Sequence, residues 1–102
     1  MIIYNTTYNV NIESVNEFIE WIKTDLIPTA TASGELLNPQ LALIMASEDD
    51  KTKSYSLQFR ANSIEDLQNW YQGTGKAKIV ELENRFTKKV VGFSTLMTVL
   101  DI

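Results

Sequence analysis

The chain has 102 residues and a net charge of −4, and it contains neither cysteine nor histidine. This composition excludes disulfides, thiolate nucleophiles and the Ser-His-Asp relay, and it would leave zinc with carboxylate ligands only. A generally acidic surface disfavours binding to nucleic acids and to anionic membranes, so we expect neither as a partner.

The first half of the chain predicts a strand, a helix and a second strand. β-Branched and aromatic residues alternate over residues 2–10, which is typical of a strand. The following helix has a capping box that starts at Ser14, and its apolar residues keep helical spacing as far as Leu26. Pro28 disfavours helical geometry at the residue before it, so this helix should end or kink there. Residues 36–47 then alternate as the second strand.

The second half predicts a strand, a helix and a last strand. A polar, turn-like stretch, "SEDDKTK", leads into the alternating residues 54–61, so the second and third strands should form a hairpin. Ser63 caps the second helix, and Gly73 and Gly75 should interrupt or kink it, because glycine weakens a helix. Residues 89–100 form the last strand.

The resulting order, β-α-β-β-α-β, is that of the ferredoxin-like fold. Right-handed crossovers place both helices on the same face of a four-stranded antiparallel sheet. We expect one α+β domain over residues 1–102, since this length suits a single core. The chain opens without a basic region or a long apolar run, and no apolar run reaches the roughly 20 residues of a membrane span. A cytoplasmic protein of bacterial type is therefore expected.

Strand alternation assigns each side chain of the sheet to one of two faces. The helix-covered face should carry most of the bulky residues, namely Tyr4, Tyr8, Val10, Leu41, Leu43, Met45, Tyr55, Leu57, Phe59, Val91, Phe93, Met97 and Val99. The helix-free face should carry Ile3, Asn5, Thr7, Asn9, Ala42, Ile44, Ala46, Ser56, Gln58, Arg60, Val90, Gly92, Ser94, Leu96, Thr98 and Leu100. This second set has one charge, whereas a solvated sheet face normally carries more Lys and Glu. We predict a homodimer packed through the helix-free face; the alternative is a monomer with a different strand phase.

Four stretches resemble a known family: the opening Met1 to Asn5, "FIEWIKTDLIPTA" at the helix end, "SYSLQF" on the third strand and "VVGFSTLMTVL" at the end. Together they are similar to a family of short bacterial proteins with a domain of unknown function, within the dimeric α+β barrel superfamily of antibiotic-biosynthesis monooxygenase-like proteins. The resemblance spans nearly the whole chain and implies a fold and a dimer, not an activity. Members commonly have His-Ile-Pro where this chain has Leu26-Ile27-Pro28, so no histidine-dependent role carries over. Leu26 is expected to pack in the core.

Arg60 is the charged residue that best indicates a binding site. With Gln58 on its own strand and Asn5, Thr7 and Ser94 on neighbouring strands, it could hold a carboxylate or another planar anion. The alternative, which we favour, is that Arg60 reaches solvent or pairs with an acidic residue across the dimer.

Aromatic residues give a second candidate site. Tyr4, Tyr8, Tyr55 and Trp21 could line a hydrophobic ligand cavity, although aromatics at strand and helix periods more often form an ordinary core.

Three other motifs are not interpreted as sites. The acidic residues 48–50 lack the glycine and distal glutamate of a calcium loop. "GTGKAK" at residues 73–78 lacks the first glycine and the final Ser or Thr of a phosphate loop. "KSYSLQF" lacks the glycine of the RNA-recognition pattern, and the basic residues 75–89 fit a solvated helix face.

These observations favour a non-catalytic small-molecule-binding or structural homodimer, without a metal or a cofactor. The alternative is a cofactor-independent monooxygenase- or isomerase-like enzyme with its pocket between helices and sheet. A small-molecule ligand is thus the second expected partner, beside another copy of the chain.

Overall fold

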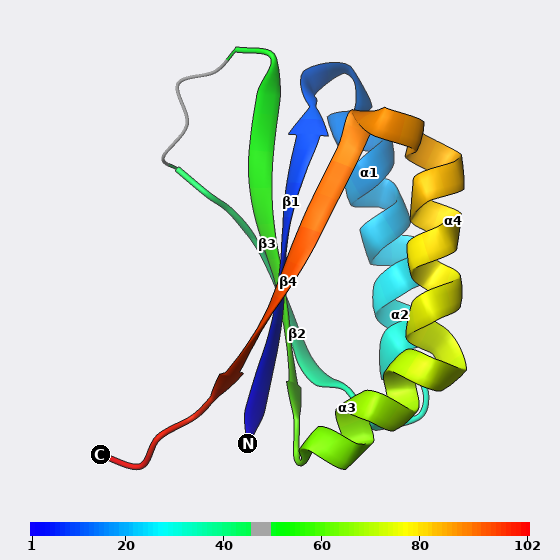
Figure 1. Cartoon of the computed structure of the whole chain (residues 1–102). Coiled ribbons are helices and arrows are strands. Elements are labelled where there is room, and N and C mark those ends of the chain that lie inside the picture. Colours follow the sequence, from blue (N-terminus) through cyan, green and yellow to red (C-terminus); the bar gives the residue numbers. More distant parts are fainter. Residues whose placement is uncertain (46–49) are drawn as a thin grey trace.

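Figure 1 shows the computed structural model as two layers, a twisted sheet and a layer of helices on one of its faces. The structure describes residues 1–45 and 50–102. The sheet consists of β1 (Ile2–Asn11), β2 (Leu37–Leu43), β3 (Thr52–Ala61) and β4 (Val90–Thr98). Its strand order is β2-β3-β1-β4, and neighbouring strands are antiparallel. This is the ferredoxin-like α+β fold that the element order predicts.

The helical layer contains two long helical segments, each interrupted by a π-turn. The first comprises a 3₁₀ turn η1 (Ile12–Ser14), α1 (Val15–Trp21), the π-turn η2 (Ile22–Leu26) and α2 (Ile27–Thr31). The second comprises α3 (Ile64–Trp70), the π-turn η3 (Tyr71–Gly75), α4 (Lys76–Phe86) and a 3₁₀ turn η4 (Thr87–Lys89). Both segments cover the same face of the sheet (Figure 1).

Each π-turn lies where the sequence predicts a break. Before Pro28, the N–H of Ile27 donates to the carbonyl of Ile22, five residues earlier. Proline has no N–H to donate, and its ring crowds the carbonyl four residues before it. The wider turn accommodates Pro28, so the helix does not end there but continues to Thr31. At the end of η3, the N–H of Lys76 likewise donates to the carbonyl of Tyr71, five residues earlier.

The two predicted helix caps differ in outcome. Ser63 Oγ accepts a hydrogen bond from the N–H of Asp66 at 3.1 Å, which confirms the cap of α3. Ser14 makes no capping hydrogen bond, so the predicted capping box is wrong. Its backbone is already helical, because the 3₁₀ turn η1 leads directly into α1, and its side chain is buried.

The core lies between the two layers and is centred on Phe18. The centroid of its ring is 5.1 Å from that of Tyr8 and 6.0 Å from those of Tyr55 and Phe86. Leu26 is buried in the same cluster, which confirms its predicted packing role. The position that carries histidine in the resembled family is therefore part of the apolar core here.

The register of β4 shows that the predicted faces of this strand are wrong. Tyr8 lies opposite Gly92 and Thr6 opposite Ser94, so these β4 residues share the helix-covered face with the β1 core residues. By alternation, Val90, Leu96 and Thr98 also lie on the helix-covered face. The residues between them lie on the helix-free face, namely Val91, Phe93, Met97 and Val99. The cause is steric: a Cβ on residue 92 would lie 2.9 Å from the ring of Tyr8, so the phase that buries this ring needs glycine there.

The second strand is shorter than predicted in the described residues. It is assigned over Leu37–Leu43, and the N–H of Ile44 still donates to the carbonyl of Ser54. Residues 46 and 47 of the predicted strand and residues 48 and 49 of the acidic stretch lie outside the described residues. Across residues 1–45 and 50–102, none of the helices combines the length and the apolar character needed to cross a membrane.

Candidate functional site

A cavity of about 330 Å³ lies between the sheet and the helical layer, beside β4. The sheet contributes Tyr4, Thr6, Tyr8, Leu57, Phe59, Val90, Gly92 and Ser94, and the cavity is also bordered along β4 by Val91 and Phe93, whose register places them on the helix-free face. The helical segments contribute Trp21, Leu26, Trp70, Gly75, Lys78, Ile79, Leu82, Glu83, Thr87 and Lys88. A second hollow of about 420 Å³ shares Tyr4, Ile79 and Ser94 with the first. Pockets of roughly 300–1,000 Å³ suit small organic molecules.

The cavity exists because the helix-covered side of β4 carries small residues. Gly92 has no side chain and Ser94 a short one, so the space between β4 and α4 is not filled. Leu96, two residues further on the same side, is 52% exposed. It lines the second hollow, so the space opens along β4.

Four residues with hydroxyl groups line this cavity, and we call Tyr4, Thr6, Tyr8 and Ser94 the hydroxyl row. Thr6 Oγ1 and Ser94 Oγ are 2.9 Å apart, and Ser94 Oγ donates to Tyr4 Oη at 3.5 Å. Tyr8 is 7% exposed, and this burial, with a smaller effect of Tyr4, raises the pKa of its phenol. The Tyr8 hydroxyl therefore stays neutral in the physiological range and offers one donor and two acceptor positions.

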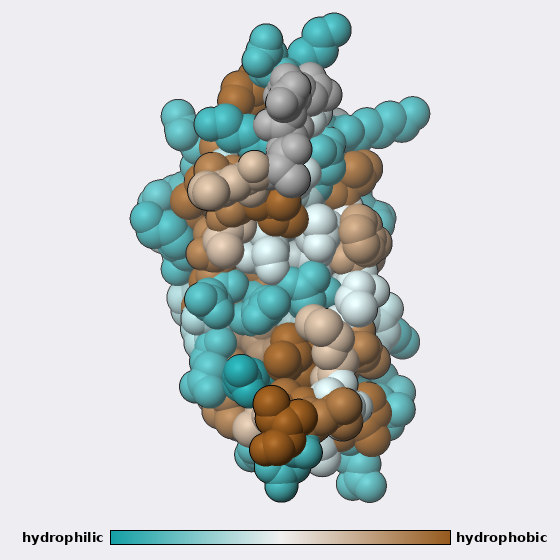
Figure 2. Space-filling view, turned by 90° about the vertical axis from the view of Figure 1, so that its left-hand side faces the viewer, coloured by the Kyte–Doolittle hydropathy of each residue, from teal (hydrophilic) through white to brown (hydrophobic). Residues whose placement is uncertain are grey.

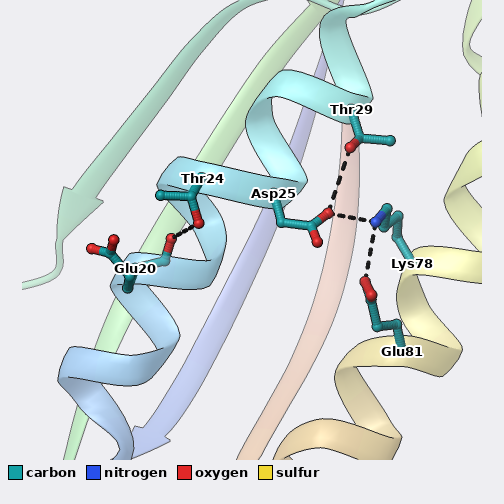
Figure 3. A network of polar contacts seen from close by, with 6 residues as sticks. All are labelled: Glu20, Thr24, Asp25, Thr29, Lys78 and Glu81. Carbon is teal, nitrogen blue, oxygen red and sulfur yellow. Dashed lines mark hydrogen bonds and ion pairs between the residues drawn. The ribbon is translucent and has the colours of Figure 1, made fainter.

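Lys78 is the charged group with the most contacts in the cavity wall. Figure 3 shows its ammonium between two carboxylates, Asp25 of η2 and Glu81 of α4. The Glu81 Oε2 atom is 3.1 Å away, and Asp25 also accepts from Thr29 Oγ1 at 3.5 Å. The hydrogen bond to Asp25 is the main cause that raises the pKa of Lys78. Lys78 thus remains protonated and links the two helical segments. No three acidic side chains of the described residues group as metal ligands would.

Trp21 and Trp70 bury polar atoms in the cavity wall without a partner. Both side chains are almost fully buried, and neither Nε1 has a hydrogen-bond acceptor within reach in the described part of the chain. An unpaired buried N–H costs roughly 1–3 kcal/mol. Trp70 also packs tightly, since a Cβ on Gly75 would lie 2.6 Å from its ring. This wall is therefore built from rigid aromatic rings at some cost in stability.

Three of the four aromatic residues predicted for a ligand cavity line it, namely Tyr4, Tyr8 and Trp21. Tyr55 belongs to the core beside Phe18 and does not line the cavity. The sequence analysis did not predict that Trp70 lines the cavity. Its helical spacing and the glycines that follow it could have indicated a large ring packed against η3.

The structure divides the residues predicted to bind an anion between two faces. Asn5, Thr7 and Gln58 lie together on the helix-free face, where Asn5 Nδ2 donates to Thr7 Oγ1 at 3.2 Å and Gln58 is directly opposite Asn5. Arg60 lies two residues further along β3 on that face. Ser94 is on the other face, in the hydroxyl row, because β4 has the opposite phase to the predicted one.

The helix-free face itself is largely uncharged. Figure 2 shows it with hydrophobic areas toward both ends and a more polar band between them. Along β4 it exposes Val91 at 59% and Phe93 at 66%. Apolar surface of this kind, on a face without helices, is typical of a protein–protein contact.

The chain has a ferredoxin-like α+β fold, and it shares this fold with several solved structures. A putative antibiotic biosynthesis monooxygenase from Deinococcus radiodurans has a TM-score of 0.72 at 10% identity, covering 100% of this chain and 95% of its own. A dimeric ferredoxin-like protein from an uncultured marine organism has a TM-score of 0.61 at 14% identity, covering 100% and 99%. A MhuD mutant with two manganese protoporphyrin IX bound per active site has a TM-score of 0.63 at 17% identity, covering 100% and 98%. At these identities the likeness shows the fold alone.

The chain belongs to the family described as a domain of unknown function (DUF4286), whose model matches residues 1–100. The family resemblance indicated by the sequence is thereby confirmed. No curated protein matches this sequence.

Proposed function

We propose that this protein is a non-catalytic small-molecule-binding protein, with one domain over residues 1–102 and its ligand in the cavity between β4 and α4. The observation that carries this proposal is the cavity of about 330 Å³, whose mostly apolar wall converges on a few polar groups. Such a combination is the usual form of a ligand site. The acidic, cysteine-free composition is compatible with a bacterial cytoplasm, which we include in the proposal.

The titratable groups of the cavity favour binding over proton transfer. Burial raises the pKa of Tyr8, and the hydrogen bond to Asp25 raises the pKa of Lys78. A phenol and an ammonium with raised pKa values keep their protons at neutral pH, so neither acts as a general base. The alternative, a cofactor-independent monooxygenase- or isomerase-like enzyme, is favoured by the fold shared with the Deinococcus protein.

The proposal includes a homodimer that pairs through the helix-free face. The composition of this face supports the proposal: along β4 it exposes the apolar side chains Val91 and Phe93, and an exposed apolar patch of this kind marks a contact surface. In this arrangement Arg60, with Asn5, Thr7 and Gln58, contacts the partner copy, whereas Ser94 contacts the ligand.

Native mass spectrometry of freshly purified protein tests both parts in one measurement. We expect the mass of a dimer, together with a small molecule that is lost on denaturation. Monomer mass under native conditions at micromolar concentration would refute the dimer. Steady conversion of the co-purified molecule in aerated buffer would favour the enzymatic alternative over a binding protein.

A further inference from the structure

The hydroxyl row is a polar strip in a mostly apolar cavity. Ser94 Oγ is hydrogen-bonded to Thr6 at 2.9 Å and to Tyr4 at 3.5 Å, and Tyr8 lies two residues from Thr6 on the same face of β1. Each hydroxyl can donate once and accept twice, so these contacts use only part of the capacity of the row. The remaining donors and acceptors lie beside the aromatic and aliphatic wall of the cavity.

The charges around the cavity do not attract an anion. Lys78 is held between the carboxylates of Asp25 and Glu81, so its charge is already compensated. The other charged lining residues, Glu83 and Lys88, are exposed and opposite in sign. Two lysines thus stand against three carboxylates. The desolvation that keeps the Tyr8 phenol neutral would also penalise a charged ligand beside it.

We infer that the cavity selects an uncharged, mainly apolar ligand and that the hydroxyl row binds its carbonyl or hydroxyl group. This inference rests on the proposed binding function, and it adds the chemical class of the ligand. The row supplies donors for a carbonyl oxygen, and the cavity volume, at the low end for ligand pockets, fits a one-ring body.

Three probes of nearly equal size and shape test which chemical group the cavity prefers. Acetophenone carries a neutral acceptor, cumene replaces the carbonyl with a methyl-bearing carbon, and benzoate replaces the acetyl group with a charged carboxylate. Titrations are followed by NMR through the two indole N–H signals, because both tryptophans of the chain line the cavity. We expect acetophenone to bind at least about tenfold more tightly than benzoate, as one buried unpaired charge costs more than one hydrogen bond yields.

Substitutions in the row test the assignment to particular groups. Thr6→Val keeps the branched shape and removes a hydroxyl of the row, and Thr7→Val is the matched control on the opposite face of β1. Tyr8→Phe keeps the ring against Gly92, and Tyr55→Phe is its control in the core outside the cavity. Each row variant should weaken acetophenone binding roughly three- to tenfold, the value of one neutral hydrogen bond, and should change cumene binding less than twofold.

Different outcomes would contradict the ligand class and the proposed binding function. If acetophenone and cumene respond alike to Thr6→Val and to Tyr8→Phe, or if benzoate binds most tightly, the assigned ligand class is wrong while the binding function stands. If none of the three probes moves either indole signal at millimolar concentration, the proposed binding function fails, and the inference fails with it.

Discussion

Gly73 and Gly75 lie in the same π-turn but in different surroundings. A Cβ on Gly73 would meet no atom within 4 Å, whereas a Cβ on Gly75 would lie 2.6 Å from the Trp70 ring. Gly75 is buried and Gly73 is exposed. The packing of the Trp70 ring therefore requires glycine at position 75, whereas no contact requires glycine at position 73.

Replacing each of these two glycines with alanine should have different effects on the free energy of unfolding. We expect Gly75→Ala to lower the free energy of unfolding by roughly 1–3 kcal/mol, because the ring of Trp70 must move. Gly73→Ala should leave it unchanged or raise it by up to ~1 kcal/mol, since alanine favours helical backbone. Urea unfolding of the two variants provides the measurement, and equal losses would refute the packing argument.

Tyr8 and Lys78 both bind their protons more strongly in the folded chain than in the unfolded one. Burial raises the pKa of Tyr8 above its ordinary 10.0, and the hydrogen bond to Asp25 raises that of Lys78 above 10.5. Above pH ~10 the unfolded chain loses these protons first, so the stabilisation is complete below that pH and declines as the pH rises.

The Tyr8→Phe variant isolates one part of this pH dependence. Between pH ~10 and pH ~12 the free energy of unfolding should fall more steeply for the wild-type chain than for Tyr8→Phe. The difference in slope should be up to about 1 kcal/mol per pH unit. Parallel curves of unfolding free energy against pH for wild type and Tyr8→Phe would contradict the assignment.

At the level of elements, both helical segments place a π-turn in the wall of the cavity. Leu26 of η2 and Gly75 of η3 line it, and Asp25 of η2 holds Lys78. π-Turns occur frequently at functional sites, because the wider turn re-aims side chains without ending the helix. Here they allow one segment to pass Pro28 and the other to bring Trp70 against Gly75.

The two serines near helix starts predict a difference between α3 and α1. Ser63→Ala should lower the free energy of unfolding by roughly 0.5–2 kcal/mol, because it removes the acceptor for the N–H of Asp66. Ser14→Ala removes no capping bond and should cost less than about 0.5 kcal/mol. Chemical unfolding of the pair is the test, and a larger loss at Ser14 would show that its hydroxyl has a role that we have not assigned.

At the scale of the molecule, the sheet is covered by helices on one face only, and β4 exposes apolar side chains on the other. Phe93 is 66% exposed there, and Val80 is 53% exposed on the outer side of α4. Both are apolar and exposed in the single chain, so they form a matched pair for testing which surface becomes an interface.

Phe93→Lys should convert the proposed dimer to a monomer, because it places an unpaired charge in a desolvated contact. Val80→Lys should leave the assembly unchanged. Light scattering coupled to size-exclusion chromatography at micromolar concentration reports the mass of each variant. Retention of the dimer by Phe93→Lys would place the interface on a surface other than the helix-free face.

Local sequence patterns are enough to predict the order of the elements, the cap at Ser63, the interruptions near Pro28 and Gly75, and the burial of Leu26. These features depend on interactions within a few residues or on the period of one element, so the local sequence contains the information. The antiparallel sheet with its helices on one face then follows from the handedness of the connections.

The phase of β4, the cavity and the face on which Ser94 lies depend instead on contacts between distant parts of the chain. Both alternating sets of β4 are apolar enough to be buried, so periodicity does not distinguish them, and burying the bulkier set is the natural but wrong choice. The contact that decides is between Gly92 and Tyr8, residues more than eighty positions apart. Because that fit excludes a side chain at position 92, it leaves the small residues facing the helices, and the space they do not fill becomes the candidate site.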